Sequence, residues 1–396
     1  MRKGVNMPET KTLALAGLIA ASFAWAGTAA AQEIKLTLAD QNSPTGWGPS
    51  HALQPWVKQV EQATKGRVKI EVYPSQTLIK GVDMWKGIRG GIADIGWCVQ
   101  GYWPEQTPLS DVVSLPFLPI SSAEKGSEAL WKLYEKFPAV QKEYSEIEPL
   151  VLYTSSPNLL VSKRQVKTLD EFKGLKFRVL GGPPTEMAKV LGAVPTLIPM
   201  PDVYQSLDKG VVDGAAAPWE AVQAFRLYEV ARNYTIAPFY VAYFSLCANK
   251  QKWQSLPQDV RGAIMSVSGL AGAKFWGRNF FDTAEQGVIE RAKAGNYELN
   301  RYTVPPDELA RWTKLAGEPI WNEWVKKMEG KGAGCPAAPR QHGDGPARHR
   351  QGVMALRACA GLHQRGRDHR HHGSHIRRCA QSLSFQSADH RRLRNH

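Results

Sequence analysis

The feature that most constrains this chain is a regular strand–helix alternation that begins near residue 33. The segment EIKLTLAD (33–40) alternates apolar and polar residues and predicts a first strand. The amphipathic segment 48–66 predicts a helix that ends at Gly66. A strand at 67–74, a helix at 81–91 and a strand at 92–99 follow. This β-α-β-α-β order predicts α/β layers with a largely parallel sheet.

A second α/β unit follows a further predicted helix at 127–147. Strands at 149–156 and 158–163 mark a crossing point between two lobes. The second unit contains a strand around Arg178, then a helix, a strand, and a helix that leads into a buried turn near 218. A strand returns at about 243, and helices run from about 257 to 294 and on to about 331. Two α/β units joined by crossing strands leave a cleft, which is the usual place for a small ligand.

The expected organisation has four parts. Residues 1–31 form a signal peptide, residues 32–155 form lobe I with a returning segment near 244–270, and residues 156–243 form lobe II with helices to about 331. Residues 333–396 form a disordered basic tail. The first part has a positively charged start, an apolar stretch too short to span a bilayer, and small residues before a cut after Ala31. We therefore expect an exported, periplasmic protein without stable membrane insertion.

The net charge of +14 is concentrated in the tail. From residue 333 onward there are twelve arginines, no lysine and three acidic residues, and nine of the ten histidines. We interpret this composition as the product of a shifted reading frame. A basic nucleic-acid-binding arm and a metal-binding tract through RDHRHHGSH remain the alternatives. The body holds only two cysteines, Cys98 and Cys247, which we expect to be reduced core residues.

Catalytic motifs are missing from the sequence of the body. It contains one histidine, His51, and no nucleophile elbow, HExxH, P-loop or dinucleotide fingerprint. We expect no enzymatic activity, no catalytic residue, no cofactor and no required metal. Arg178 is more informative, because it lies near the end of a strand just before GGPP (181–184). At that end a side chain faces the cleft, where a guanidinium can grip a carboxylate; a structural ion pair is the alternative.

The order of several landmarks resembles the solute-binding proteins of TRAP (tripartite ATP-independent periplasmic) transporters of the DctP type. The landmarks are ADQNSP, GRVKIEVYPSQTL, GGIADIGW, SLPFL, TLDEFKGLKFRV, PMPDVYQSLDKGVVDGAAAP and ANKQKWQSLPQDVR, and they cover about residues 33–331. The resemblance implies a two-lobed, type II-like periplasmic binding protein with a long helix that spans both lobes. It also implies an organic-acid ligand, membrane permease subunits as partners, and Arg178 as the clamp on the substrate carboxylate.

The chain departs from the family pattern at two polar positions. Ala217 stands where many members have an asparagine before the proline, and Asn158 is the nearest match to a second arginine. Aromatic residues are the expected replacement, and we expect at least three of them to line the site. The candidates are Trp47, Trp97, Tyr102, Trp103, Trp219, Phe239, Tyr240 and Phe244. Such walls suit an apolar or aromatic monocarboxylate, whereas an aromatic cage assisted by Glu220 or Gln100 would suit an amine or zwitterion.

The sequence leaves two further functions open. A periplasmic binding protein that serves an ABC importer or a sensor would have similar lobes. A nucleic-acid-binding protein would rely on the basic tail, but this reading conflicts with the export signal. We therefore expect a periplasmic carboxylate-binding protein that does not bind nucleic acid.

Overall fold

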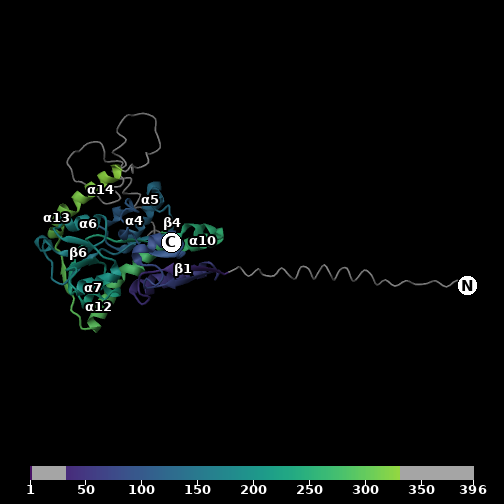
Figure 1. Ribbon diagram of the computed structural model, residues 1–396, viewed down its shortest axis with the longest axis horizontal. Helices are drawn as coiled ribbons and strands as arrows, with labels where there is room; N and C mark the ends of the chain where they lie inside the picture. The colour runs from purple at the N-terminus through teal and green to yellow at the C-terminus, as the bar shows by residue number, and fades with distance from the viewer. Residues whose placement is uncertain (2–32, 331–396) are drawn as a thin grey trace, which may run out of the picture.

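The computed structural model describes residue 1 and residues 33–330, so the expected signal peptide and the basic tail lie outside the described residues. The described chain forms two α/β lobes, each built on its own β-sheet (Figure 1). The predicted two-lobed α/β architecture is confirmed. We call the part around the five-stranded sheet lobe I and the part around the six-stranded sheet lobe II.

Lobe I is built on a sheet with the strand order β2-β1-β3-β10-β4. Its strands are β1 (Ile34–Ala39), β2 (Val68–Tyr73), β3 (Ile95–Val99), β4 (Ile147–Thr154) and β10 (Tyr243–Asn249). β1 pairs in parallel with β2 and β3, whereas β10 runs antiparallel to β3 and β4. β10 is reversed because it returns from lobe II.

Lobe II is built on a sheet with the order β11-β9-β5-β8-β6-β7. Its strands are β5 (Leu159–Ser162), β6 (Lys176–Val179), β7 (Val194–Leu197), β8 (Gly214–Ala217), β9 (Asn233–Ile236) and β11 (Asn300–Thr303). β6 is parallel to β7 and β8, and β5 is antiparallel to β8 and β9. Each sheet is therefore mixed rather than largely parallel, because each one receives a strand from the opposite lobe.

Helices pack around both sheets. In lobe I these are α2 (Gln54–Ala63), α3 (Met84–Arg89), α4 (Ala123–Lys136), α5 (Pro138–Glu143), α9 (Lys250–Ser255) and α10 (Gln258–Ser266). In lobe II they are α6 (Pro183–Val190), α7 (Val203–Asp208), α8 (Trp219–Ala224) and α13 (Pro306–Ala316), and α14 (Glu318–Gly330) follows α13. The single helix expected at 127–147 is split into α4 and α5, because Pro138 cannot continue the backbone hydrogen bonds of α4.

A long helical run spans both lobes, as expected. It consists of α11 (Gly269–Trp276), the π-helical turn η8 (Gly277–Asp282) and α12 (Ala284–Ala294). α11 packs on α4 and β4 in lobe I, and α12 packs on α8 in lobe II. Gly277 allows the close approach to α4, since a Cβ there would lie 2.6 Å from the Ala123 carbonyl oxygen. The run therefore bridges the lobes along one side.

Two crossing segments, 155–158 and 237–242, connect the lobes. The Ser155 amide donates to the Ala242 carbonyl at 2.8 Å, and the Asn158 amide donates to the Tyr240 carbonyl at 2.8 Å. The Asn158 side chain also donates to the Tyr240 carbonyl, at 3.1 Å. These bonds hold the two segments side by side, so they form the hinge between the lobes.

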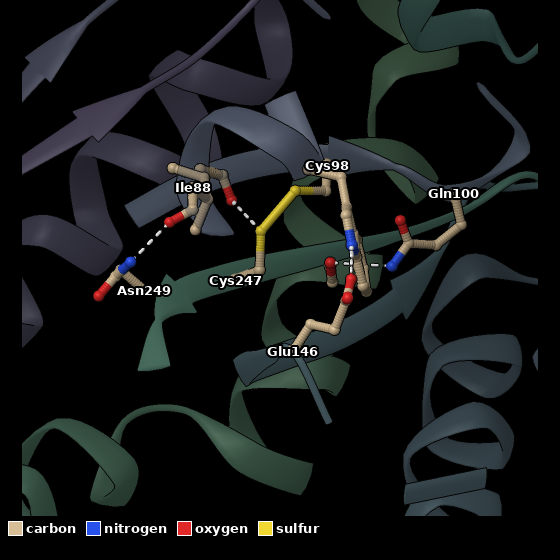
Figure 2. The surroundings of a disulfide bond; sticks show 9 residues. Ile88, Cys98, Gln100, Glu146, Cys247 and Asn249 are labelled. Atoms are coloured by element: carbon tan, nitrogen blue, oxygen red, sulfur yellow. Dashed lines mark hydrogen bonds between the residues drawn. A yellow bond between two sulfur atoms is a disulfide. The ribbon is translucent and has the colours of Figure 1, made fainter. Parts of the chain in front are cut away.

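Cys98 on β3 and Cys247 on β10 are joined by a disulfide, as Figure 2 shows. The expectation of two reduced core thiols is therefore wrong. The two strands are direct neighbours, and the register places Cys247 opposite Gly96 and Cys98 opposite Ser245. The cysteines are thus diagonal neighbours with a Cα–Cα separation of 6.8 Å, which sequence reading could not reveal because they lie 149 residues apart.

Candidate ligand site between the lobes

Arg178 is buried at the carboxyl end of β6, with 3% of its surface exposed. Its Nε donates to the Ile198 carbonyl at 2.8 Å, and its Nη1 donates to the Ala216 carbonyl at 3.0 Å. No carboxylate among the described residues forms an ion pair with it. The alternative of a structural salt bridge therefore fails within the described chain.

Two buried phenols, Tyr102 and Tyr240, lie near the Arg178 guanidinium. Burial raises the pKa of both phenols, and the positive charge of Arg178 opposes that rise. The Tyr102 hydroxyl accepts a hydrogen bond from the Met200 amide at 2.8 Å, and the Tyr240 hydroxyl accepts one from the Leu180 amide at 3.3 Å. The two carbonyls that Arg178 binds and the two phenols near it are all neutral groups.

Asp40 and Glu220 are buried acidic side chains from opposite lobes. Asp40 follows β1, and its carboxylate accepts hydrogen bonds from the amide and the side chain of Asn42 at 3.0 and 2.8 Å. Burial raises the pKa of Asp40 to about 7 against these hydrogen bonds. Burial also raises the pKa of Glu220 to about 8, opposed by the Gly48 amide and increased by the charge of Asp40. Within residues 33–330 no group of three or more His, Cys, Asp or Glu side chains is placed to hold a metal.

Aromatic side chains cluster where β3, β4 and β10 meet the spanning helical run. The Trp97 ring lies 4.9 Å from Phe244 and 5.7 Å from Phe280, between ring centroids. Tyr153 lies 5.3 Å from Phe244 and accepts a hydrogen bond from Trp97 Nε1. Burial raises the pKa of the Tyr153 hydroxyl, and the negative charges of Asp40 and Glu220 raise it further. These rings therefore form an apolar wall next to the two acids.

Four of the predicted site residues thus gather in two groups, with Tyr102 and Tyr240 near Arg178, and Trp97 and Phe244 in the aromatic wall. Trp47 lies at the edge of the lobes, where its amide donates to Gln223 at 3.2 Å and its ring stacks on His51. Ala217 lies at the end of β8, between Arg178's carbonyl partner Ala216 and the start of α8.

The remaining predicted residues contact other side chains and carbonyl groups of the protein. Trp219 stacks on Tyr234, Phe239 packs on Phe172 and Trp312, and the Trp103 indole donates to the Val82 carbonyl. The Gln100 amide donates to Ser245 on β10 at 3.0 Å inside lobe I (Figure 2). Asn158 uses its amide in the hinge. Ligand contact by these residues stays a prediction.

Sequence reading missed Asp40, Tyr153 and Phe280. Asp40 could have been found from the sequence, because it directly follows a predicted parallel strand, and side chains at that end of a strand face the cleft. Tyr153 had a weaker signal, since the residues before it in its strand, 149–152, are all apolar and give no alternation to assign a face. Phe280 lies in the π-helical turn, whose irregular backbone shifts the side chains relative to an ordinary helix.

The lobes are closed on each other by hydrogen bonds around this site. The Gly181 amide of lobe II donates to the Gly101 carbonyl of lobe I at 3.0 Å. The bonds from Met200 to Tyr102 and from Trp47 to Gln223 also cross between the lobes. Two hinged lobes around a buried arginine that has no carboxylate partner in the described part of the chain are typical of a bilobal solute-binding protein.

Comparison with known proteins identifies the family. The chain belongs to the bacterial extracellular solute-binding proteins of family 7, whose model matches residues 42–327. It is a TRAP solute-binding protein, a class that binds small carboxylates and works with membrane permeases. The C4-dicarboxylate-binding periplasmic protein DctP of Rhodobacter capsulatus is 25% identical over 325 residues, which cover 80% of this chain and 93% of that protein.

Two solved structures are similar over most of the chain. A TRAP solute-binding protein from Rhodoferax ferrireducens, in complex with copurified benzoate, has a TM-score of 0.73 and 27% identity and covers 83% of this chain and 98% of its own. A marine metagenome TRAP protein specific for aromatic acid ligands, in complex with 3-hydroxybenzoate, has a TM-score of 0.73 and 27% identity, with coverages of 84% and 98%.

Proposed function

We propose that this chain is the periplasmic receptor for an aromatic monocarboxylate, which it captures with Arg178 and delivers to a TRAP membrane permease. The observation that carries the proposal is the burial of Arg178 without a carboxylate partner among the described residues. An unpaired buried charge is costly. A bound carboxylate supplies the missing partner, and lobe closure strengthens that pair by excluding water.

The aromatic character of the ligand is supported by the wall of Trp97, Tyr153, Phe244 and Phe280. Flat rings offer apolar contact to a flat ligand and few polar groups to a sugar acid. The two similar structures contain benzoate and 3-hydroxybenzoate, which supports the same ligand class.

The proposal includes no catalytic step and no nucleic-acid partner. Export is assigned to residues 1–31, and the arginine-rich stretch from residue 333 has no part in binding the ligand. No helix within residues 33–330 has both the length and the apolar character needed to cross a bilayer.

The test is calorimetric titration of the purified full-length chain with benzoate, mandelate, succinate and glucuronate. We expect the aromatic acids to bind more tightly than the other two. Arg178→Gln should weaken benzoate binding by about a hundredfold or more, since a charge-assisted bond inside a closed site is lost. Arg164→Gln is the matched control, because Arg164 is an exposed arginine on the same lobe. We expect this variant to bind benzoate as tightly as the unmodified chain does.

Unchanged benzoate affinity in Arg178→Gln would show that the arginine has a purely structural role. Equal or tighter binding of succinate or glucuronate would reject the aromatic ligand class while leaving the anchor intact. A circular-dichroism spectrum and a melting curve of each variant separate lost binding from lost folding.

A further inference from the structure

Glu220 is a buried acid with an acceptor atom that no described residue satisfies. It is 3% exposed, and its Oε1 has no hydrogen-bond partner among the described residues. Gln223 lies one turn further along α8 and is 1% exposed; its Oε1 accepts from the Trp47 amide, while its Nε2 is likewise unpartnered within the described chain. Buried polar atoms are normally paired, so one face of α8 presents two polar atoms that lack partners among the described residues.

Asp40 of lobe I lies near enough to Glu220 of lobe II for their charges to interact. The charge of Asp40 acts on Glu220, and both act on the Tyr153 hydroxyl at the edge of the aromatic wall. Neither acid forms an ion pair with a lysine or arginine of the described chain. The acids therefore form a second polar end of the site, where Glu220 Oε1 is an acceptor without a partner among the described residues, whereas Arg178 is the donor end.

The two ends belong to the same edge of lobe II. Arg178 binds the carbonyl of Ala216 near the end of β8, and Glu220 follows Ala216 by four residues. Four residues span at most about 14 Å even when fully extended, and the chain turns at Pro218. Both side chains therefore lie at the same edge of the lobe II sheet.

We infer that the ligand carries a hydrogen-bond donor, a hydroxyl or ammonium group, at the end opposite its carboxylate, and that Glu220 is the residue that selects for it. This inference rests on the proposed function, because it assumes that Arg178 holds the carboxylate. A site built around a buried acceptor disfavours an analogue that lacks the donor, since the acceptor then stays unpaired.

Matched ligand pairs test the selection. Hydroxyl and methyl groups are similar in size, so 3- and 4-hydroxybenzoate are compared with 3- and 4-methylbenzoate, and 4-(aminomethyl)benzoate presents an ammonium. Using calorimetry on the full-length chain, we expect at least one donor-bearing acid to bind about tenfold or more tighter than its methyl partner. Glu220→Ala should abolish this preference and leave the methyl compounds bound within about threefold.

Glu220→Gln keeps the shape of the side chain and a neutral acceptor. It therefore provides a second test of the inference if the alanine variant fails to fold. Retained hydroxyl preference in Glu220→Gln identifies a hydroxyl donor, whereas loss of preference for the aminomethyl compound identifies an ammonium. Equal affinity within every pair, or an equal loss for both members in Glu220→Ala, would overturn the inference. Failure of every carboxylate to bind the unmodified chain would instead reject the proposed function, and this inference with it.

Discussion

At the scale of single residues, the buried acids Asp40 and Glu220 connect the ligand site to the stability of the fold. The pKa of Asp40 rises from 3.8 to about 7, and the pKa of Glu220 rises from 4.5 to about 8. In the folded state both groups therefore hold protons that they release in the unfolded state. Their contribution to stability is complete below the unfolded values and is lost as the pH rises through about 7 and 8.

We therefore predict that the unliganded chain is less stable at about pH 8.5 than at about pH 6, with Asp40 and Glu220 together accounting for about 4 kcal/mol of the difference. The measurement is urea unfolding followed by tryptophan fluorescence at the two pH values. The double variant Asp40→Asn/Glu220→Gln should show a smaller difference, because its amides do not titrate. Some difference should persist, since burial also raises the pKa of Asp111 to about 8. An identical pH dependence in the double variant would contradict the assignment.

The same residues show what the sequence could reveal about the site. The place of Arg178 near the end of a buried strand was predictable from the sequence, whereas its role as the carboxylate clamp stays a prediction. Tyr102 and Tyr240 followed from their places in loops near the cleft. The pairing of Asp40 with Glu220 was not predictable, because it depends on how two lobes far apart in sequence close on each other.

At the scale of elements, the strand–helix alternation predicted the first three strands and the helices between them. The missed strands were β8, β9 and β11. β8 reads Gly-Ala-Ala-Ala and lacks the β-branched and aromatic residues that mark strands, and its extended form depends on pairing with β5 and β6. The helical stretch predicted at 257–294 is divided into α10, α11 and α12, and η8 between the last two is a local rearrangement that apolar periodicity does not reveal.

The disulfide between β3 and β10 leads to a second prediction about stability. It closes a segment of 149 residues that includes all of β5 to β9, so it restricts the unfolded chain strongly. The chain-entropy model gives about 5 kcal/mol for a loop of this size, and measured contributions are commonly about 2–4 kcal/mol. We expect a reducing agent to lower the melting temperature by several degrees.

The control is the variant Cys98→Ala/Cys247→Ala, whose melting temperature should not respond to the reducing agent. Peptide mapping under non-reducing conditions should recover Cys98 joined to Cys247. A melting temperature of the unmodified chain that is equal with and without reductant would show that the bond contributes nothing to stability.

At the scale of the whole molecule, the chain crosses between the lobes several times, and this sets how the lobes move. The segments 155–158 and 237–242 form the hinge, and the run from α11 to α12 bridges the lobes along one side. α13 and α14 add a further link: Trp312 packs on Phe172 in lobe II, and the Trp324 indole donates to the Pro108 carbonyl in lobe I. We therefore expect the lobes to move by a hinge rotation that opens the edge where Tyr102 contacts Met200.

The bond from the Met200 amide to the Tyr102 hydroxyl is therefore a latch between the lobes. We predict that Tyr102→Phe shifts the unliganded chain toward an open form and weakens binding of an aromatic acid by about two- to tenfold, the value of one hydrogen bond. Small-angle X-ray scattering should show a larger radius of gyration than that of the unmodified chain. The matched control is Tyr234→Phe, whose hydroxyl bonds to Ala231 within lobe II at 3.0 Å and should leave both properties unchanged.

Scattering also separates a latch from a direct ligand contact. If Tyr102 acts through closure, the variant differs in shape before any ligand is added, and saturating ligand restores the compact form. If the hydroxyl only touches the ligand, the unliganded variant keeps the radius of the unmodified chain and the affinity alone falls. The second result would remove the latch and leave closure to the other bonds between the lobes, from Gly181 to Gly101 and from Trp47 to Gln223.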